Sequence, residues 1–202
     1  MPTHPRIRRP LMALLVLALL MTGIAAAPQP VLAAGCTEVL TNGGLESAAG
    51  WTLESSKGYT LISPYLAHTG SQAAYLGGTD KATDRLFTTL TVPENSTTLL
   101  RFWWQMRTVD TRTGNDGLSV LLTDAAGVPL RVLLTITDAN SVGIWQQAGM
   151  DLSAFAGQTV QLHFLAKTDA ALVTDFFVDD VSVTACSTAA LNFHIFLPSV
   201  RR

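Results

Sequence analysis

Apolar and polar residues alternate with a period of two along two stretches of this chain, residues 99–108 and 160–167. This period places alternate side chains on opposite faces of a β-strand. In the second stretch, Gln161 and His163 lie on the more polar side. In the first stretch the apolar positions are Leu100, Phe102, Trp104 and Met106, and the other positions are Arg101, Trp103, Gln105 and Arg107. Each strand is therefore predicted to have one core face and one half-polar face.

Shorter strands are predicted between turn signals rich in glycine, proline and asparagine. They cover residues 59–62, 72–76, 86–92, 118–123, 130–137 and 145–150. The sequence contains no convincing long amphipathic helix. We therefore predict an all-β fold, a two-sheet antiparallel β-sandwich of the jelly-roll type.

The closing strand, residues 174–186, changes phase in its middle. Its apolar positions have even numbers up to Val178 and odd numbers from Val181, so a regular strand would send half of them into water. A β-bulge at Asp179 and Asp180 would restore the phase. Such a bulge would turn one carboxylate inward, onto a cation for example, and the alternative is a solvated acidic kink.

The two ends of the chain differ from its middle. Residues 1–34 combine a basic start, an apolar run too short for a membrane span and a small-residue cleavage site. We predict that they are a signal peptide and that the protein is secreted and extracellular. Residues 35–186 then form the sandwich domain. The tail, residues 187–202, is apolar with a basic end and too short to span a bilayer; it is an extra strand, a docking peptide or a sorting tag.

The two cysteines of the chain, Cys36 and Cys186, bracket the predicted domain. Disulfides persist outside the cell, so we expect these cysteines to pair and to tie the termini of the sandwich together. The alternative is a lipoprotein, because residues 33–36 loosely resemble a lipobox. That alternative would leave Cys186 unpaired.

Charge and motifs exclude two classes of function. The chain has a net charge of −2, and removal of the leader with its three arginines leaves about −5, which argues against a nucleic-acid partner. The histidines do not have metal-ligand spacing, and Asp179 and Asp180 are adjacent in sequence rather than facing across a cleft as in a glycosidase. We therefore predict that the protein is not an enzyme.

Six short motifs occur in an order that resembles a known group of folds. They are residues 42–46 (NGGLE), 50–52 (GWT), 68–74 (HTGSQAA), 99–104, 151–158 (DLSAFAGQ) and 177–181 (FVDDV). The chain resembles the galactose-binding-like jelly-roll modules over nearly all of residues 38–184. These include carbohydrate-binding modules, MAM-type adhesion domains and accessory β-domains of immune-inhibitor-type secreted metalloproteases.

The resemblance implies a structural calcium ion between the first and last strands. The matching positions are Glu46 and Asp180, with Asp179 as a further candidate and backbone oxygens near Gly44 or Ser71. Calcium takes six to eight oxygen ligands and mixes carboxylates with carbonyl groups, which suits this set.

The resemblance also implies a sugar site on a concave sheet face, where aromatic rings stack on sugar and polar groups bind hydroxyls. The matching candidates are Trp103, Gln105, Arg107, Gln161 and His163. The alternative is that Trp103 packs under a loop. We expect a non-catalytic carbohydrate-binding module whose partner is a polysaccharide or cell-surface glycan. The competing hypothesis is an extracellular structural or adhesion domain that binds protein.

Overall fold

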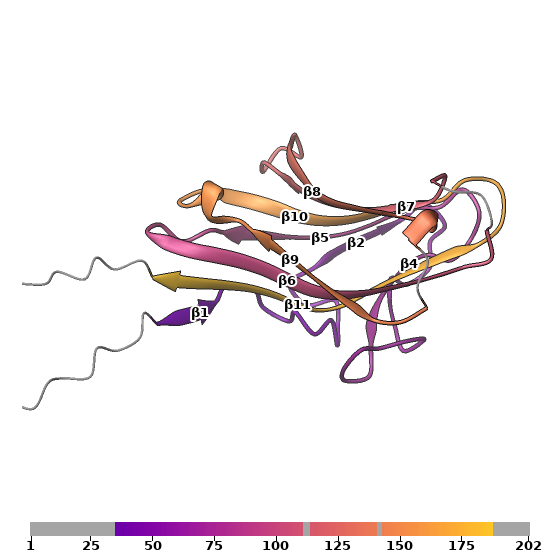
Figure 1. Cartoon of the computed structure of the whole chain (residues 1–202), viewed down its shortest axis with the longest axis horizontal. Coiled ribbons are helices and arrows are strands. Elements are labelled where there is room, and N and C mark those ends of the chain that lie inside the picture. Colours follow the sequence, from indigo (N-terminus) through magenta and orange to yellow (C-terminus); the bar gives the residue numbers. More distant parts are fainter. Residues whose placement is uncertain (1–34, 111–113, 141–142, 188–202) are drawn as a thin grey trace, which may run out of the picture. The chain divides into compact units, whose positions relative to one another are not determined.

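The computed structural model describes residues 35–110, 114–140 and 143–187, and within them the chain forms a sandwich of two antiparallel sheets (Figure 1). Sheet A has the order β3 (Ile62–Ser63), β4 (Ala73–Gly77), β11 (Thr174–Ser187), β6 (Ser96–Thr108) and β9 (Gln146–Asp151), with β1 (Cys36–Glu38) also paired to β11. Sheet B has the order β2 (Thr52–Ser55), β5 (Thr83–Thr91), β10 (Thr159–Lys167), β7 (Gly117–Thr123) and β8 (Pro129–Thr137). Two short 3-10 turns, Asp138–Asn140 and Ser153–Phe155, are the helical elements of the described residues. The predicted all-β sandwich is confirmed.

The core lies between the sheets and is built from the alternating positions that the sequence indicated. On β6, Leu100, Phe102 and Met106 are fully buried, and on β10 the buried positions include Leu162 and Phe164. The rings of Phe102 and Phe164 meet edge to face across the sandwich, with 5.1 Å between centroids. The odd-numbered residues of β6 and β10 therefore project from the two outer faces.

Strand bounds agree with the sequence best where the alternation is long. The predicted strand at residues 59–62 is mostly wrong, because only Ile62 and Ser63 pair with β4. Tyr59 instead contributes its hydroxyl, which hydrogen-bonds to the carboxylate of the buried Asp84. A polar side chain with a buried partner fixes this segment without ladder pairing.

Cys36 and Cys186 form a disulfide and are direct partners in the ladder between β1 and β11, with their Cα atoms 4.0 Å apart. The bond joins the first and last described strands, as predicted. The lipoprotein alternative needed an unpaired Cys186, and the structure does not support it.

The predicted bulge in the closing strand is present. The pairing of β11 with β6 shifts register between Asp179 and Ser182, and Asp180 has a positive φ of 47°. The extra residue turns Val181 into the core, where it is only 4% exposed. Asp179 is buried on the other side of the strand. The bulge thus restores the apolar phase of β11.

The predicted signal peptide, residues 1–34, and all of the predicted tail after Ser187 lie outside the described residues. No helix among the described residues is long and apolar enough to cross a membrane.

Candidate binding faces

The structure separates the five predicted sugar-binding residues onto two faces. Trp103, Gln105 and Arg107 lie on the outer face of sheet A, whereas Gln161 and His163 lie on the outer face of sheet B. The expectation that they share one face is therefore wrong. Both strands alternate correctly, but β6 and β10 belong to different sheets.

On sheet A, the predicted residues are largely occupied by packing. The ring of Trp103 is stacked on the ring of His68, with 4.1 Å between centroids and an angle of 16°. Gln105 is 3% exposed, and its amide donates a hydrogen bond of 2.9 Å to the carbonyl oxygen of Gly143. The alternative in which Trp103 lies under a loop is the arrangement that the structure supports.

An aromatic cluster covers the rest of this face. Tyr65 and Tyr75 both stack on Phe177, at centroid distances of 5.9 Å and 5.3 Å. Arg107 extends over the same ring, with its guanidinium carbon 5.7 Å from the centroid. Of these side chains Tyr65 is 63% exposed, so one aromatic ring is available to a ligand.

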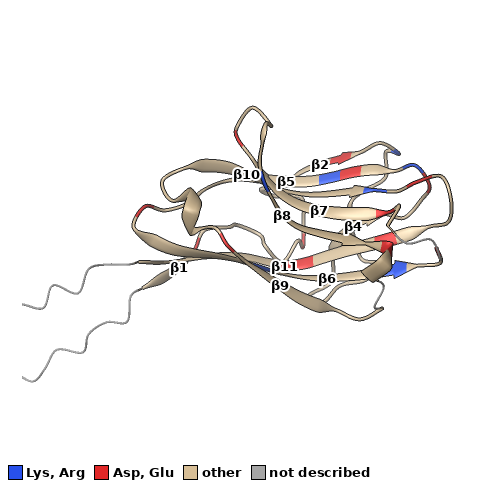
Figure 2. Cartoon of the chain, turned by 45° about the horizontal axis from the view of Figure 1, so that its top comes forward, with Lys and Arg blue, Asp and Glu red and all other residues tan. Residues whose placement is uncertain are grey.

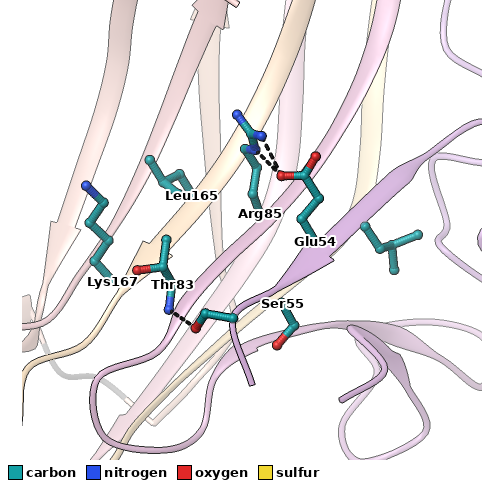
Figure 3. Close-up of a pocket in the computed structure, with 8 residues that line it drawn as sticks. Glu54, Ser55, Thr83, Arg85, Leu165 and Lys167 are labelled. Carbon is teal, nitrogen blue, oxygen red and sulfur yellow. Dashed lines mark hydrogen bonds and ion pairs between the residues drawn. The ribbon is translucent and has the colours of Figure 1, made fainter. Parts of the chain in front are cut away.

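The outer face of sheet B is hollowed by a groove of about 740 Å³ (Figure 3). Arg85 on β5 forms an ion pair with Glu54 on the neighbouring β2, and the Arg85 Nε lies 3.0 Å from the carboxylate. These side chains are 40% and 50% exposed, so their remaining donors and acceptors face the groove. Leu165 and Lys167 on β10 line its other side.

A second hollow of about 170 Å³ adjoins the groove and shares Arg85 and Leu165 with it. Its floor contains His163, whose ring is stacked on Phe87 with 4.7 Å between centroids. The guanidinium carbon of Arg85 lies over the ring of Phe87, 5.1 Å from its centroid. Sheet B therefore combines an aromatic pair, an ion pair and two adjoining hollows on one face.

His163 is almost completely buried and its Nε2 lies 3.0 Å from the hydroxyl of Thr123. Burial, and to a lesser degree the charge of Arg85, lowers the pKa of His163 below its ordinary value of 6.5. The folded state therefore favours the neutral ring.

This shift predicts a loss of stability in acid. A depressed folded-state pKa stabilises the fold fully above the unfolded pKa of 6.5, and the contribution is lost as the pH falls through the folded value. Urea unfolding at pH 7 and pH 5 should show a smaller acid-induced loss in His163→Gln than in the wild type. Equal losses in both proteins would contradict this assignment. The raised pKa values of Asp175 and Asp179, both caused by burial, act in the opposite direction in both proteins.

The predicted acidic residues of the bulge hold the turn of residues 68–72. The buried Asp179 accepts hydrogen bonds from the backbone N–H groups of His68 and Thr69, at 2.8 Å and 3.2 Å. Asp180 accepts one from the hydroxyl of Thr69 at 2.6 Å, and its other oxygen lies 2.5 Å from Nδ1 of His68. Both carboxylates are thus partnered by this turn.

Glu46 binds the far end of the same turn. Its carboxylate accepts hydrogen bonds from the N–H of Ser71 at 2.9 Å and from the Ser71 hydroxyl at 2.7 Å, and these bonds lower the pKa of Glu46. Gly70 lies beneath it with a positive φ of 63°, which favours glycine, and a Cβ there would lie 1.9 Å from Oε1 of Glu46 and push this side chain away from Ser71.

The arrangement satisfies Glu46, Asp179 and Asp180 with N–H and O–H donors, which fits a structural role without a cation. The three do not form a close group of ligand atoms, and the expected calcium ion at these positions stays a prediction. Among the described residues, the one group of three acidic side chains with ligand atoms within 4.8 Å of one another is Asp110, Asp116 and Asp169.

Sequence reasoning missed Glu54, Arg85 and Phe87. Their signal is the alternation of β5, in which Arg85 and Phe87 share the parity opposite to the buried Leu86. The predicted strand begins at Leu86, three residues later than β5, and so excludes Arg85. Charged residues are sparse on the strands of both sheets (Figure 2). The exposed ion pair of Arg85 and Glu54 in the groove is therefore a candidate ligand-binding feature.

Comparison with solved structures shows the fold at low sequence identity. TmCBM61, solved in complex with beta-1,4-galactotriose, is 14% identical with a TM-score of 0.57, and the match covers 73% of this chain and 97% of that chain. The N-terminal CBM22-1-CBM22-2 tandem domain of Paenibacillus barcinonensis Xyn10C is 17% identical with a TM-score of 0.51, covering 81% and 49%. The K3 cleaved adhesin domain of Lys-gingipain from Porphyromonas gingivalis W83 is 15% identical with a TM-score of 0.50, covering 75% and 98%.

A search of the curated proteins gave no match. The family model of the MAM domain, meprin/A5/mu, matches residues 42–187, which is most of the chain. The matched region begins at the Asn-Gly-Gly turn before Glu46 and ends with β11, so it contains every strand of both sheets except β1. The chain therefore belongs to the MAM domain family.

Proposed function

We propose that this protein is a secreted, non-catalytic binding module whose ligand is a carbohydrate, and that the sugar lies along the groove on the outer face of sheet B. The observation that carries the proposal is the exposed ion pair of Arg85 and Glu54 beside the stacked rings of Phe87 and His163. Charged side chains offer directed hydrogen bonds to sugar hydroxyls, and the face of an aromatic ring offers contact to the C–H groups of a sugar.

The comparisons support a binding module at the level of the fold. The solved structure with the highest TM-score among those described above carries beta-1,4-galactotriose, which makes β-1,4-linked galactose oligomers a rational first probe. The groove supports a non-catalytic role. Glycoside hydrolysis uses two carboxyl groups, and Glu54 is the one acidic residue among the described residues that line the groove. Glu54 is also paired with Arg85.

The test is a binding screen with β-1,4-galactotriose and a panel of soluble polysaccharides, read by affinity electrophoresis and calorimetry. Arg85→Ala should weaken binding about tenfold or more, a loss of ~1.4 kcal/mol, because it removes donors that line both hollows of this face. Arg107→Ala is the matched control, since Arg107 is an exposed arginine on the outer face of sheet A. We expect it to bind as the wild type does.

Two outcomes would overturn this assignment. Loss of binding in Arg107→Ala with full binding in Arg85→Ala would move the site to the aromatic face of sheet A. No retention on any glycan would favour the competing hypothesis of a protein-binding adhesion domain. One observation favours that second function: β8 is an edge strand of sheet B, and its Leu130 and Val132 are 45% and 58% exposed.

A further inference from the structure

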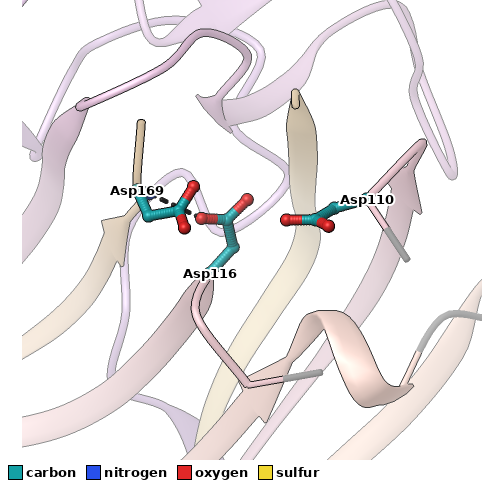
Figure 4. Close-up of side chains that lie close together, drawn as sticks. All are labelled: Asp110, Asp116 and Asp169. Atoms are coloured by element: carbon teal, nitrogen blue, oxygen red, sulfur yellow. Dashed lines mark hydrogen bonds between the residues drawn. The ribbon is translucent and has the colours of Figure 1, made fainter. Parts of the chain in front are cut away.

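Three aspartates from two loops, one between β6 and β7 and one after β10, meet at one end of the sandwich (Figure 4). Asp110 follows β6 of sheet A, Asp116 precedes β7 of sheet B, and Asp169 follows β10 of sheet B. One oxygen of each carboxylate lies within 4.8 Å of one oxygen of the others. The group therefore connects the rims of the two sheets.

Asp116 is the central member of this group and lies between the other two in Figure 4. It is fully buried, and its Oδ1 accepts a hydrogen bond of 2.6 Å from the backbone N–H of Asp169. Its Oδ2 is inaccessible to solvent and has no hydrogen-bond partner among the described residues. No lysine or arginine in the described parts of the chain forms an ion pair with Asp116 or Asp169.

Such an arrangement is unfavourable unless something neutralises it. A buried carboxylate oxygen without a partner loses its hydration, and neighbouring carboxylates repel one another in a medium of low dielectric constant. A cation coordinated by one oxygen from each side chain would replace the lost hydration and screen the repulsion between the carboxylates. Oxygen atoms around one calcium ion are each 2.3–2.6 Å from it, so two of them are at most about 5 Å apart, as here.

We propose that Asp110, Asp116 and Asp169 bind a calcium ion that links the rims of sheets A and B. The donors are all hard oxygen ligands, and the set contains no thiolate or imidazole. The site is distinct from Glu46, Asp179 and Asp180, whose carboxylates are partnered by the turn of residues 68–72. None of the three aspartates lines the sugar groove, so either proposal can fail without the other.

The test titrates calcium into the disulfide-bonded protein after treatment with a chelator, and follows heat of binding and thermal unfolding. Calcium should bind and raise the melting temperature of the wild type. Asp116→Asn should abolish that rise. In chelator the same variant should melt at or above the temperature of the wild type, because one of the repelling charges is gone. A residue with only a structural role would give a lower melting temperature under both conditions.

Two control variants locate the ion. Asp80→Asn changes an exposed aspartate of the loop between β4 and β5 and should keep the full calcium response. Glu46→Gln should also keep it. The proposal is overturned if the wild type takes up no calcium, if Asp116→Asn keeps the full response, or if Glu46→Gln alone removes it. The last result would place the ion at the turn of residues 68–72.

Discussion

Replacing Cys36 and Cys186 together by serine is expected to lower the free energy of unfolding by about 5 kcal/mol, on the chain-entropy estimate for a closed loop of this length. The two residues are 150 positions apart, so the bond constrains nearly the whole domain in the unfolded state. The native structure should change little, because β1 has three residues and all of them are exposed. The effect is therefore expected to arise mainly in the unfolded chain.

Urea unfolding of the double variant beside the oxidised wild type measures this loss. The wild type unfolded in a reductant is the matched control, and it should agree with the double variant. If the variant loses far less stability than the estimate, the unfolded chain keeps structure that already holds its ends together. If only the variant is destabilised and the reduced wild type is not, the serine side chains rather than the missing bond are responsible.

The sequence predicts faces well because alternation is a local property. The buried positions of β6, β10 and β11 follow from the period of two, and the bulge follows from the change of phase within one strand. Pairing between strands is not local. Nothing in residues 99–108 or 160–167 indicates that they belong to different sheets, and so Trp103 and His163 were placed on one face.

The two sites proposed for this protein also depend on contacts between segments that are distant in sequence, which local patterns do not reveal. The groove depends on the pairing of β2 with β5, which brings Glu54 opposite Arg85. The acidic group depends on two loops, the connection between β6 and β7 and the segment that follows β10 about 50 residues later. Single aspartates in turns are ordinary, and only the three-dimensional arrangement shows that Asp116 and its neighbours converge. Adjacent charges are visible in the sequence, and the sequence therefore predicts a cation at Asp179 and Asp180 instead.

The bulge in β11 is packed against the Asn-Gly-Gly turn before Glu46. The N–H of Val181 donates a hydrogen bond of 2.8 Å to the carbonyl oxygen of Gly43. A Cβ at Gly43 would lie 1.7 Å from the carbonyl oxygen of Val181, a backbone atom that cannot rotate away. Glycine is required at this position for close approach of two backbones.

Gly43→Ala is therefore expected to destabilise the fold by about 3 kcal/mol or more, at the upper end of the cost of overpacking, because relief of the clash needs a backbone shift. That shift would also break the hydrogen bond from Val181 and loosen the turn of residues 68–72, which Asp179 holds from the same bulge. Gly44→Ala is the matched control, since a Cβ there meets nothing within 4 Å, and it should be near neutral. Urea unfolding of both variants measures the difference. Equal stability of the two would show that the turn and the bulge move apart at little cost, and that the close contact is not what fixes the phase of the closing strand.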